Sequence, residues 1–255
     1  MNTNAIPYQR SRRGDKALIF IHGFLDAGEL WESTIDHVSC PGYEVVTFDL
    51  PGMGALSSWE GQLTLDTLSA AVISVVDTVG KPCVLVGHSM GTQLAELAAA
   101  ARPELVKGLV LISPIPLAGL PVDQQTIDIM HALGQNRDLQ LAVRKQFSPE
   151  LSEEQLEAHM QVGLKPTREA CAALFDAWSQ GDPRGNEPSA FQGPVRVVTG
   201  SNDPFAAPPI VEAGIQPRFG QFSMRVLDGA NHWAHLTMGS IMGEEINQFV
   251  EKNFG

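Results

Sequence analysis

Residues 84–94 read Val-Leu-Val-Gly-His-Ser-Met-Gly-Thr-Gln-Leu, and this stretch decides the fold. A short apolar run leads into the pattern Gly-x-Ser-x-Gly, and residues 92–101 continue it with strong helix formers. The order predicts a buried strand, a sharp turn and a helix. Ser89 stands at the turn.

The residues around Ser89 suit a reactive hydroxyl. A serine on a tight strand-to-helix turn takes strained backbone angles, and Gly87 and Gly91 give the flanking chain room to pass. The helix that follows directs free backbone N–H groups and the positive end of its dipole toward Ser89. We interpret Ser89 as a nucleophile for acyl chemistry. The alternative is a glycine-rich turn with an incidental serine, because the pattern is short.

The composition predicts a compact globular protein. The chain of 255 residues is 44% hydrophobic and 18% charged, which gives enough apolar material for a core and too little charge for disorder. Its formal net charge of -12 disfavours nucleic acids and anionic membranes as partners, because both would repel it. The acidity mainly indicates a soluble protein.

The cysteines and the first residues favour a cytoplasmic location. Cys40, Cys83 and Cys171 are too few and too scattered for a disulfide framework or a zinc site. Residues 1–16 lack the apolar stretch of a secretory signal, and no apolar run approaches the length of a transmembrane helix. We expect the protein in the reducing cytoplasm.

Strand-like and helix-like segments alternate in the first part of the chain. Apolar runs predict strands at 17–22, 44–49, 84–88 and 109–113, and helical periodicity predicts helices at 29–38, 64–79 and 92–101. Thr64 and Gly80 are suitable caps for the second helix. Such alternation indicates a parallel sheet with helices on both faces.

The pattern changes after Pro114. No strand-like run occurs in residues 115–189, where periodicity predicts helices at 124–133, 139–147, 153–163 and 168–180. Strands are again predicted at 194–200 and 223–227, with a last helix at 239–253. We therefore predict an α/β fold with a mostly parallel, doubly wound sheet. Residues 1–114 and 190–255 form its core, and residues 115–189 form an inserted helical cap.

Residues able to do chemistry stand where predicted strands end. They are His22-Gly23-Phe24, Asp49, Ser89, Asp203 and His232. The carboxyl ends of parallel strands share one edge, where ligands bind. The chain order Ser, Asp, His therefore predicts a nucleophile, a carboxylate and an imidazole on a common rim.

This arrangement resembles the α/β-hydrolase superfamily, over nearly the whole chain from Ala17 to Phe254. The matching pieces are Gly87-His88-Ser89-Met90-Gly91, His22-Gly23-Phe24 with Trp31, Asp49-Leu50-Pro51-Gly52-Met53-Gly54, Gly200-Ser201-Asn202-Asp203 and Gly229-Ala230-Asn231-His232-Trp233. The family often begins with an antiparallel hairpin. Only about 16 residues precede Ala17, so we expect one or two edge strands to be missing or shortened.

The resemblance implies a role for each catalytic residue. Ser89 would attack a carbonyl, His232 would take and later return the proton, and Asp203 would orient the imidazole. The backbone N–H groups of Phe24 and Met90 would form the oxyanion hole.

Other residues compete for two of these roles. His235 could be the base, but His232 occupies the matching Gly-x-x-His position. Asp49 and Asp123 could be the acid, but Ser-Pro occupies the end of the alternative strand, which favours Asp203. Asp49 is then expected to brace loops.

Five residues are candidates for the substrate pocket: His22, His88, Phe205, Trp233 and Trp178. For the first two, hydrogen bonding to loop backbone beside the site is the simpler interpretation. No set of histidines has the spacing of a metal site, so neither a metal nor a cofactor is expected.

We expect a serine hydrolase that cleaves a carboxylic ester or lactone of a small, mainly apolar substrate through an acyl-enzyme. The same fold and triad also serve carbon–carbon bond hydrolases, lyases and cyclases. A ligand-binding receptor with little turnover would have the same sequence features. The identity of the substrate and the oligomeric state stay open at this point.

Overall fold

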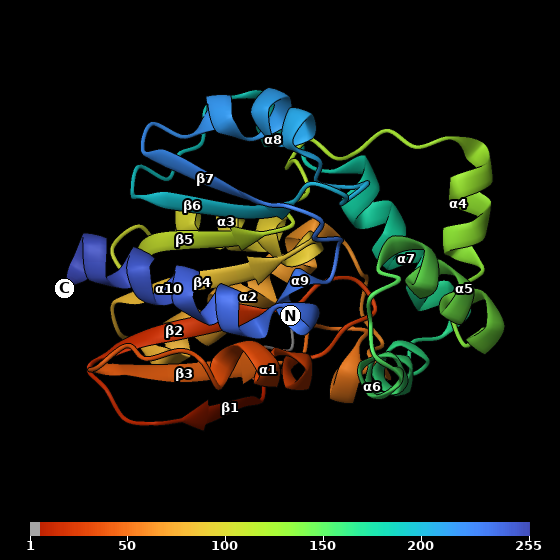
Figure 1. Cartoon of the computed structure of the whole chain (residues 1–255), viewed down its shortest axis with the longest axis horizontal. Helices are drawn as coiled ribbons and strands as arrows, with labels where there is room; N and C mark the ends of the chain where they lie inside the picture. Colours follow the sequence, from red (N-terminus) through yellow and green to blue (C-terminus); the bar gives the residue numbers. More distant parts are fainter. Residues whose placement is uncertain (1–5) are drawn as a thin grey trace.

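The computed structural model describes residues 6–255, which form one sheet with helices on both faces (Figure 1). The sheet order is β1-β3-β2-β4-β5-β6-β7. The strands are β1 (Tyr8–Ser11), β2 (Lys16–Ile21), β3 (Tyr43–Phe48), β4 (Cys83–His88), β5 (Val106–Ile112), β6 (Val195–Gly200) and β7 (Phe222–Leu227). All pairings are parallel except that of β1 with β3. The predicted α/β class and mostly parallel sheet are confirmed.

Helices connect the strands and close the chain. The α-helices are α1 (Glu32–Ile35), α2 (Leu65–Val79), α3 (Met90–Ala101), α4 (Gln124–His131), α5 (Arg137–Phe147), α6 (Glu153–Gly163), α7 (Arg168–Gln180), α8 (Pro208–Gly214), α9 (Ala234–Thr237) and α10 (Gly239–Phe254). Short 3₁₀ helices are η1 (Gly28–Trp31), η2 (Gly54–Leu56), η3 (Pro183–Asn186) and η4 (Gln216–Arg218). Within residues 6–255, none of these helices has the length and apolar character needed to cross a bilayer.

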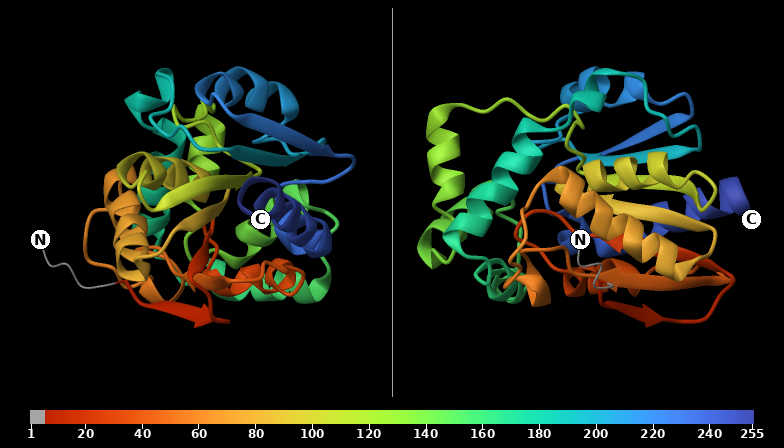
Figure 2. Two further views of the ribbon diagram at one scale, coloured as in Figure 1. Left: turned by 90° about the vertical axis from the view of Figure 1, so that its left-hand side faces the viewer. Right: turned by 180° about the vertical axis from the view of Figure 1, so that it is seen from behind.

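Each face of the sheet buries its own apolar cluster. Helices α2 and α3 cover one face, and α1 and α10 cover the other (Figures 1 and 2). Successive residues of β2 alternate between the clusters, with Ile19 on the α2–α3 side and Phe20 on the α10 side. This double burial explains why the strands are continuous apolar runs.

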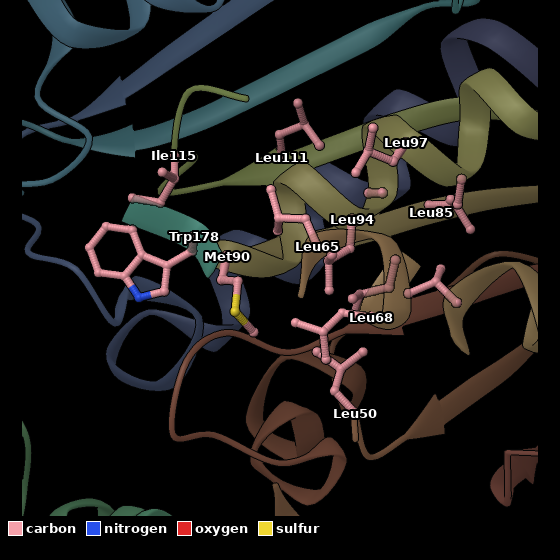
Figure 3. Packing of buried hydrophobic residues seen from close by; sticks show 14 of the residues in the cluster. Leu50, Leu65, Leu68, Leu85, Met90, Leu94, Leu97, Leu111, Ile115 and Trp178 are labelled. Atoms are coloured by element: carbon pink, nitrogen blue, oxygen red, sulfur yellow. The ribbon is translucent and has the colours of Figure 1, made fainter. Parts of the chain in front are cut away.

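Helices α4 to α7, which we call the α4–α7 segment, follow β5 and pack at one end of the sheet (Figure 1). Trp178 of α7 belongs to the same apolar cluster as Met90 of α3 (Figure 3). The buried Gln93 amide donates hydrogen bonds to the carbonyl oxygens of Pro116 (2.9 Å) and Trp178 (3.0 Å). The segment is therefore continuous with the core at the end where Ser89 lies.

The strand nearest the amino terminus, β1, forms one edge of the sheet and is short. β1 is four residues long and pairs antiparallel with β3, with Tyr8 opposite Phe48. This one short strand stands where the resemblance suggested a hairpin. Residues 1–5, part of the predicted core range 1–114, lie outside the described residues.

The prediction of one helix over residues 29–38 is wrong. The chain instead makes η1 and then α1, which ends at Ile35. The guanidinium of Arg12 donates to the carbonyl oxygens of Ile35 (3.2 Å) and Val38 (2.7 Å), which satisfies acceptors left free where the helix ends. Helices α8 and α9 were not predicted, because they are too short to show a helical period in the sequence.

Candidate active site

The turn between β4 and α3 holds Ser89 in a strained conformation. Its φ and ψ are 51° and -124°, a region that residues with a side chain rarely adopt. A Cβ at Gly91 would lie 2.4 Å from the carbonyl oxygen of Ile21, and one at Gly87 would lie 2.7 Å from that of Gly91. Only glycine fits at both positions, so the turn packs directly against β2 and fixes the serine hydroxyl.

His232 connects Ser89 to Asp203. Its Nε2 lies 3.0 Å from Ser89 Oγ, and its Nδ1 lies 3.0 Å from each carboxylate oxygen of Asp203. The three side chains follow β7, β4 and β6, which places them at one edge of the sheet. All three residues are buried, with exposed fractions of 7% for Ser89, 5% for His232 and 1% for Asp203.

The loop after β6 keeps Asp203 ionised. The backbone N–H groups of Phe205 (2.9 Å) and Ala206 (3.1 Å) donate to Asp203 Oδ1. Burial alone would raise the pKa of Asp203, but His232 and the N–H of Phe205 help to outweigh it, and the pKa is lowered to about 2. An ionised Asp203 accepts the Nδ1 proton of His232, which leaves Nε2 free to accept the hydroxyl proton of Ser89.

Ser89 and His232 line a cavity between the sheet edge and the α4–α7 segment. The cavity holds about 500 Å³ of space not filled by atoms, part of which opens to solvent. Most of its wall is apolar, including Phe24, Met130, Leu133, Phe147, Trp178 and Phe205. The candidate nucleophile therefore faces a small, mainly apolar space.

The two residues expected to form the oxyanion hole lie next to Ser89. Met90 is the first residue of α3, so its N–H has no acceptor within the helix. Phe24 lies in the loop after β2 and lines the cavity. A Cβ at Gly23 would lie 3.1 Å from Ser89 Cβ, so the loop that carries Phe24 passes directly beside the serine.

Four of the five pocket candidates line this cavity: His88, Phe205, Trp178 and Trp233. His22 does not, and its assignment to the pocket is corrected. Its Nδ1 lies 2.9 Å from the carbonyl oxygen of Gly23, and its Nε2 accepts a hydrogen bond of 2.9 Å from the N–H of Leu50. The His22 ring is thus committed to two loops, and burial lowers its pKa, which keeps the ring neutral.

The alternative acids have other roles. Asp49 accepts hydrogen bonds from the N–H groups of Gly28 (2.8 Å) and Ala55 (2.7 Å), so it braces two loops. Asp123 accepts from the N–H of Thr126 at 2.7 Å and caps α4. Within residues 6–255, neither carboxylate is hydrogen-bonded to His232.

A second group of titratable residues lies behind His232. We call Asp26, His88, His159 and His235 the Asp26 cluster; their exposed fractions are 0–1%. His159 Nε2 is hydrogen-bonded to Asp26 Oδ1, and His88 Nδ1 lies 3.3 Å from Asp26 Oδ2. His88 Nε2 donates to the carbonyl oxygen of His232 at 3.0 Å. The cluster thus connects α6 to the backbone of the candidate base.

His235, the alternative base, belongs to this cluster and not to the cavity wall. Its ring centroid lies 4.0 Å from that of His88 and 4.8 Å from that of Trp31. Burial and the neighbouring histidines hold the pKa of His235 well below its ordinary value. Asp26, His88 and His235 have ligand atoms within 4.8 Å of one another, so in the described part of the chain they are the residues that could hold a metal ion.

Charge in the Asp26 cluster is carried by the carboxylate. Burial alone would raise the pKa of Asp26, but His159 and His88 outweigh it and hold the pKa well below its ordinary value. Burial, together with the charge of Arg144, lowers the pKa of His159 to about 4. An ionised Asp26 therefore accepts its hydrogen bond from a neutral His159.

Comparison with known proteins identifies the family of the chain. Residues 18–241 match the Alpha/beta hydrolase family, and the chain belongs to that family. The chain is 36% identical over 121 residues to lipase LipV of Mycobacterium tuberculosis, an alignment that covers 47% of this chain and only 45% of the lipase. It is 24% identical to (E)-2-((N-methylformamido)methylene)succinate hydrolase of Acinetobacter baylyi, covering 92% of this chain and 88% of that protein.

Solved structures show the same fold. An esterase (EaEST) from Exiguobacterium antarcticum superposes with a TM-score of 0.86 at 16% identity, covering 96% of this chain and 95% of that one. A bromoperoxidase from Bacillus anthracis superposes with a TM-score of 0.84 at 18% identity, covering 96% and 93%.

Proposed function

We propose that this chain is a serine hydrolase that cleaves a carboxylic ester or lactone of a small, mainly apolar substrate through an acyl-enzyme. The observation that carries the proposal is the hydrogen-bonded series Ser89–His232–Asp203 with its serine end at an apolar cavity. Relatives named lipase, esterase and hydrolase support it. The three free, buried cysteines support the cytoplasmic location that belongs to the proposal.

In the proposed reaction, Ser89 Oγ attacks the carbonyl carbon of the substrate while His232 Nε2 takes the hydroxyl proton. The carbonyl oxygen becomes an oxyanion, which accepts hydrogen bonds from the N–H groups of Met90 and Phe24. The bond to the leaving oxygen then breaks, and His232 donates the proton to it. An acyl-enzyme remains.

The second half repeats these steps with water. His232 takes a proton from the water, whose oxygen attacks the acyl carbon, and the bond to Ser89 Oγ breaks. His232 returns the proton to Ser89, and the carboxylic acid leaves. Asp203 stays ionised throughout and stabilises the imidazolium that forms twice in the cycle.

The α4–α7 segment acts in this proposal as the cap predicted for residues 115–189. Its residues Met130, Leu133 and Phe147 supply much of the apolar wall. Apolar surroundings favour an acyl chain or ring over a sugar or peptide, because buried polar groups of such substrates would lack partners.

A fluorophosphonate probe tests the nucleophile directly. We expect the probe to add its mass to the wild type and to leave Ser89→Ala unlabelled, and the substitution should lower ester hydrolysis by at least about 10⁴-fold. A panel of esters, lactones and β-diketones identifies the bond that is cleaved. Absence of labelling under conditions that label a known serine hydrolase would refute the proposal. If only β-diketones were cleaved, the reaction would be carbon–carbon bond hydrolysis and not ester hydrolysis.

A further inference from the structure

One side chain of the cavity wall differs in kind from its apolar neighbours. Arg144, on α5, lines the same cavity as Ser89 and is only 2% exposed. Its guanidinium carbon lies 6.0 Å from the ring centroid of Trp233, another residue of the cavity wall. A cation is therefore built into the wall of a mainly apolar space.

The guanidinium is fixed in place but its hydrogen bonding is incomplete. Nη1 donates to Gln140 Oε1 at 2.9 Å, and Nη2 donates to the carbonyl oxygen of Leu25 at 3.2 Å. A Cβ at Gly163 would lie 2.2 Å from Nη2, so α6 packs tightly against the group. Nε is buried and has no hydrogen-bond partner among the described residues. A buried donor without an acceptor is unfavourable, so the hydrogen-bonding capacity of this guanidinium is not fully used by the described residues.

The charge of Arg144 is also incompletely balanced. Within residues 6–255, no carboxylate oxygen lies within 4.0 Å of its guanidinium nitrogens. Asp26 favours the charged form from a greater distance, but its two oxygens face His159 and His88. Burial lowers the pKa of Arg144 to about 10, so the group is still a cation at neutral pH. Buried charges in folded proteins are normally paired.

We propose that Arg144 binds a carboxylate carried by the substrate, so that the enzyme acts on small esters or lactones whose acyl part ends in a carboxylate. This inference rests on the hydrolase function proposed above. The apolar wall would contact the carbon chain between the two groups, while Arg144 neutralises the terminal charge and Ser89 attacks the ester carbonyl. Such a charge pair, formed away from water, selects strongly for the anionic substrate.

The test compares two substrates of nearly equal shape, monomethyl glutarate and methyl pentanoate, which differ in a terminal carboxylate against a methyl group. We expect the wild type to prefer the glutarate ester. Arg144→Gln should lower the ratio of kcat/KM for the glutarate ester to kcat/KM for methyl pentanoate on the order of 100-fold. Arg144→Lys, which keeps the charge without the planar fork, should retain part of the preference.

Arg137→Gln is the matched control. Arg137 lies on the same helix, is exposed, and pairs with Glu157 at 2.7 Å outside the cavity. Its substitution should leave the ratio of the two kcat/KM values unchanged. A matching ester with a terminal phosphonate distinguishes a carboxylate site from a general anion site. We expect the wild type to have a lower kcat/KM for the phosphonate ester than for the glutarate ester. Equal values would indicate a general anion site.

Three results separate the possible failures. An equal loss of kcat/KM for both esters in Arg144→Gln would show that Arg144 only braces the Leu25 loop and would refute the inference. A wild type without preference for the glutarate ester would also refute it. In both cases the hydrolase function stands. If neither ester is cleaved, we would titrate the protein with glutarate in a calorimeter. Binding by the wild type that disappears in Arg144→Gln would support the anion site although the proposed function fails. Absence of binding would refute the site.

Discussion

Two buried aspartates within residues 6–255 each accept a hydrogen bond from a histidine, and we assign the two pairs different roles. Asp203 and Asp26 each hold a histidine by a hydrogen bond, His232 and His159 respectively. The second nitrogen of His232 meets Ser89 Oγ at 3.0 Å, whereas that of His159 has no partner among the described residues. An aspartate–histidine pair is therefore no sign of catalysis by itself. What decides is whether the imidazole reaches a hydroxyl beside a cavity.

The surroundings of the two pairs also differ, because only the Asp203 pair lies beside the cavity. Asp203 takes two further backbone donors, and its partner lines the cavity. The imidazole of His159 packs against the Trp233 ring with centroids 4.9 Å apart, between α6 and the core. We interpret the Asp203 pair as catalytic and the Asp26 pair as a structural link between the α4–α7 segment and the sheet.

Removing one histidine from each region should give the largest difference in activity. His232→Ala should lower kcat for a short p-nitrophenyl ester on the order of 10⁶-fold, because both proton transfers lose their carrier. His235→Ala should lower it by less than about tenfold, because its ring lies in the Asp26 cluster. Steady-state kinetics on both variants, with circular dichroism as a folding control, gives the answer. Loss of activity only in His235→Ala would reverse the assignment.

The carboxylates give the next largest contrast. Asp203→Asn should lower kcat by about 10⁴-fold, since the amide favours the wrong tautomer of His232. Asp26→Asn should instead lower the free energy of unfolding by about 3 kcal/mol, because Arg144 and His159 lose a buried carboxylate. Kinetics and urea unfolding of both variants measure the two effects. If Asp26→Asn lost activity as strongly as Asp203→Asn at full stability, the Asp26 pair would be catalytic.

Much of this arrangement could be predicted from the sequence, because its causes are local. α6 and α7 begin and end where their periodicity and caps place them, with Ser152 and Thr167 accepting from the helix N–H groups. Thr64 and Gly80 cap α2 as expected. The meeting of residues from separate strands follows from the parallel order, which brings all carboxyl ends to one edge.

The Asp26 cluster and Arg144 could not be predicted. Asp26 and His159 are 133 residues apart, and nothing next to either indicates a partner. Arg144 stands in a helix whose other basic residue near the end, Lys145, is exposed, so its burial depends on how α5 meets the sheet. Tertiary packing decides both. His22 was a pocket candidate, but hydrogen bonding to loop backbone was the simpler interpretation, and its ring is hydrogen-bonded to the backbone of Gly23 and Leu50.

The two regions should also differ, by a smaller amount, in the pH range over which they contribute to the free energy of unfolding. The pKa of His159 is lowered by burial from 6.5 to about 4 in the folded protein, so between these values the unfolded chain binds more protons. The stability from a neutral His159 is therefore complete above 6.5 and is lost as the pH falls toward 4. Asp203, with a pKa lowered from 3.8 to about 2, loses its contribution only below 3.8.

Urea unfolding between about pH 7.5 and about pH 4.5 isolates the first window, in which one group can contribute a slope of up to about 1.4 kcal/mol per pH unit. We expect the free energy of unfolding to fall with acidification and His159→Gln to reduce that slope. The variant should not abolish it, because the pKa values of His22 and His235 are lowered in the same direction. Asp203→Asn should leave the slope unchanged in this range. An unchanged slope in His159→Gln would mean that His159 binds the same number of protons in the folded and unfolded states, so that its pKa is not lowered by folding. A steeper slope in the variant would mean that His159 is protonated in the folded protein and is an ion-pair partner of Asp26.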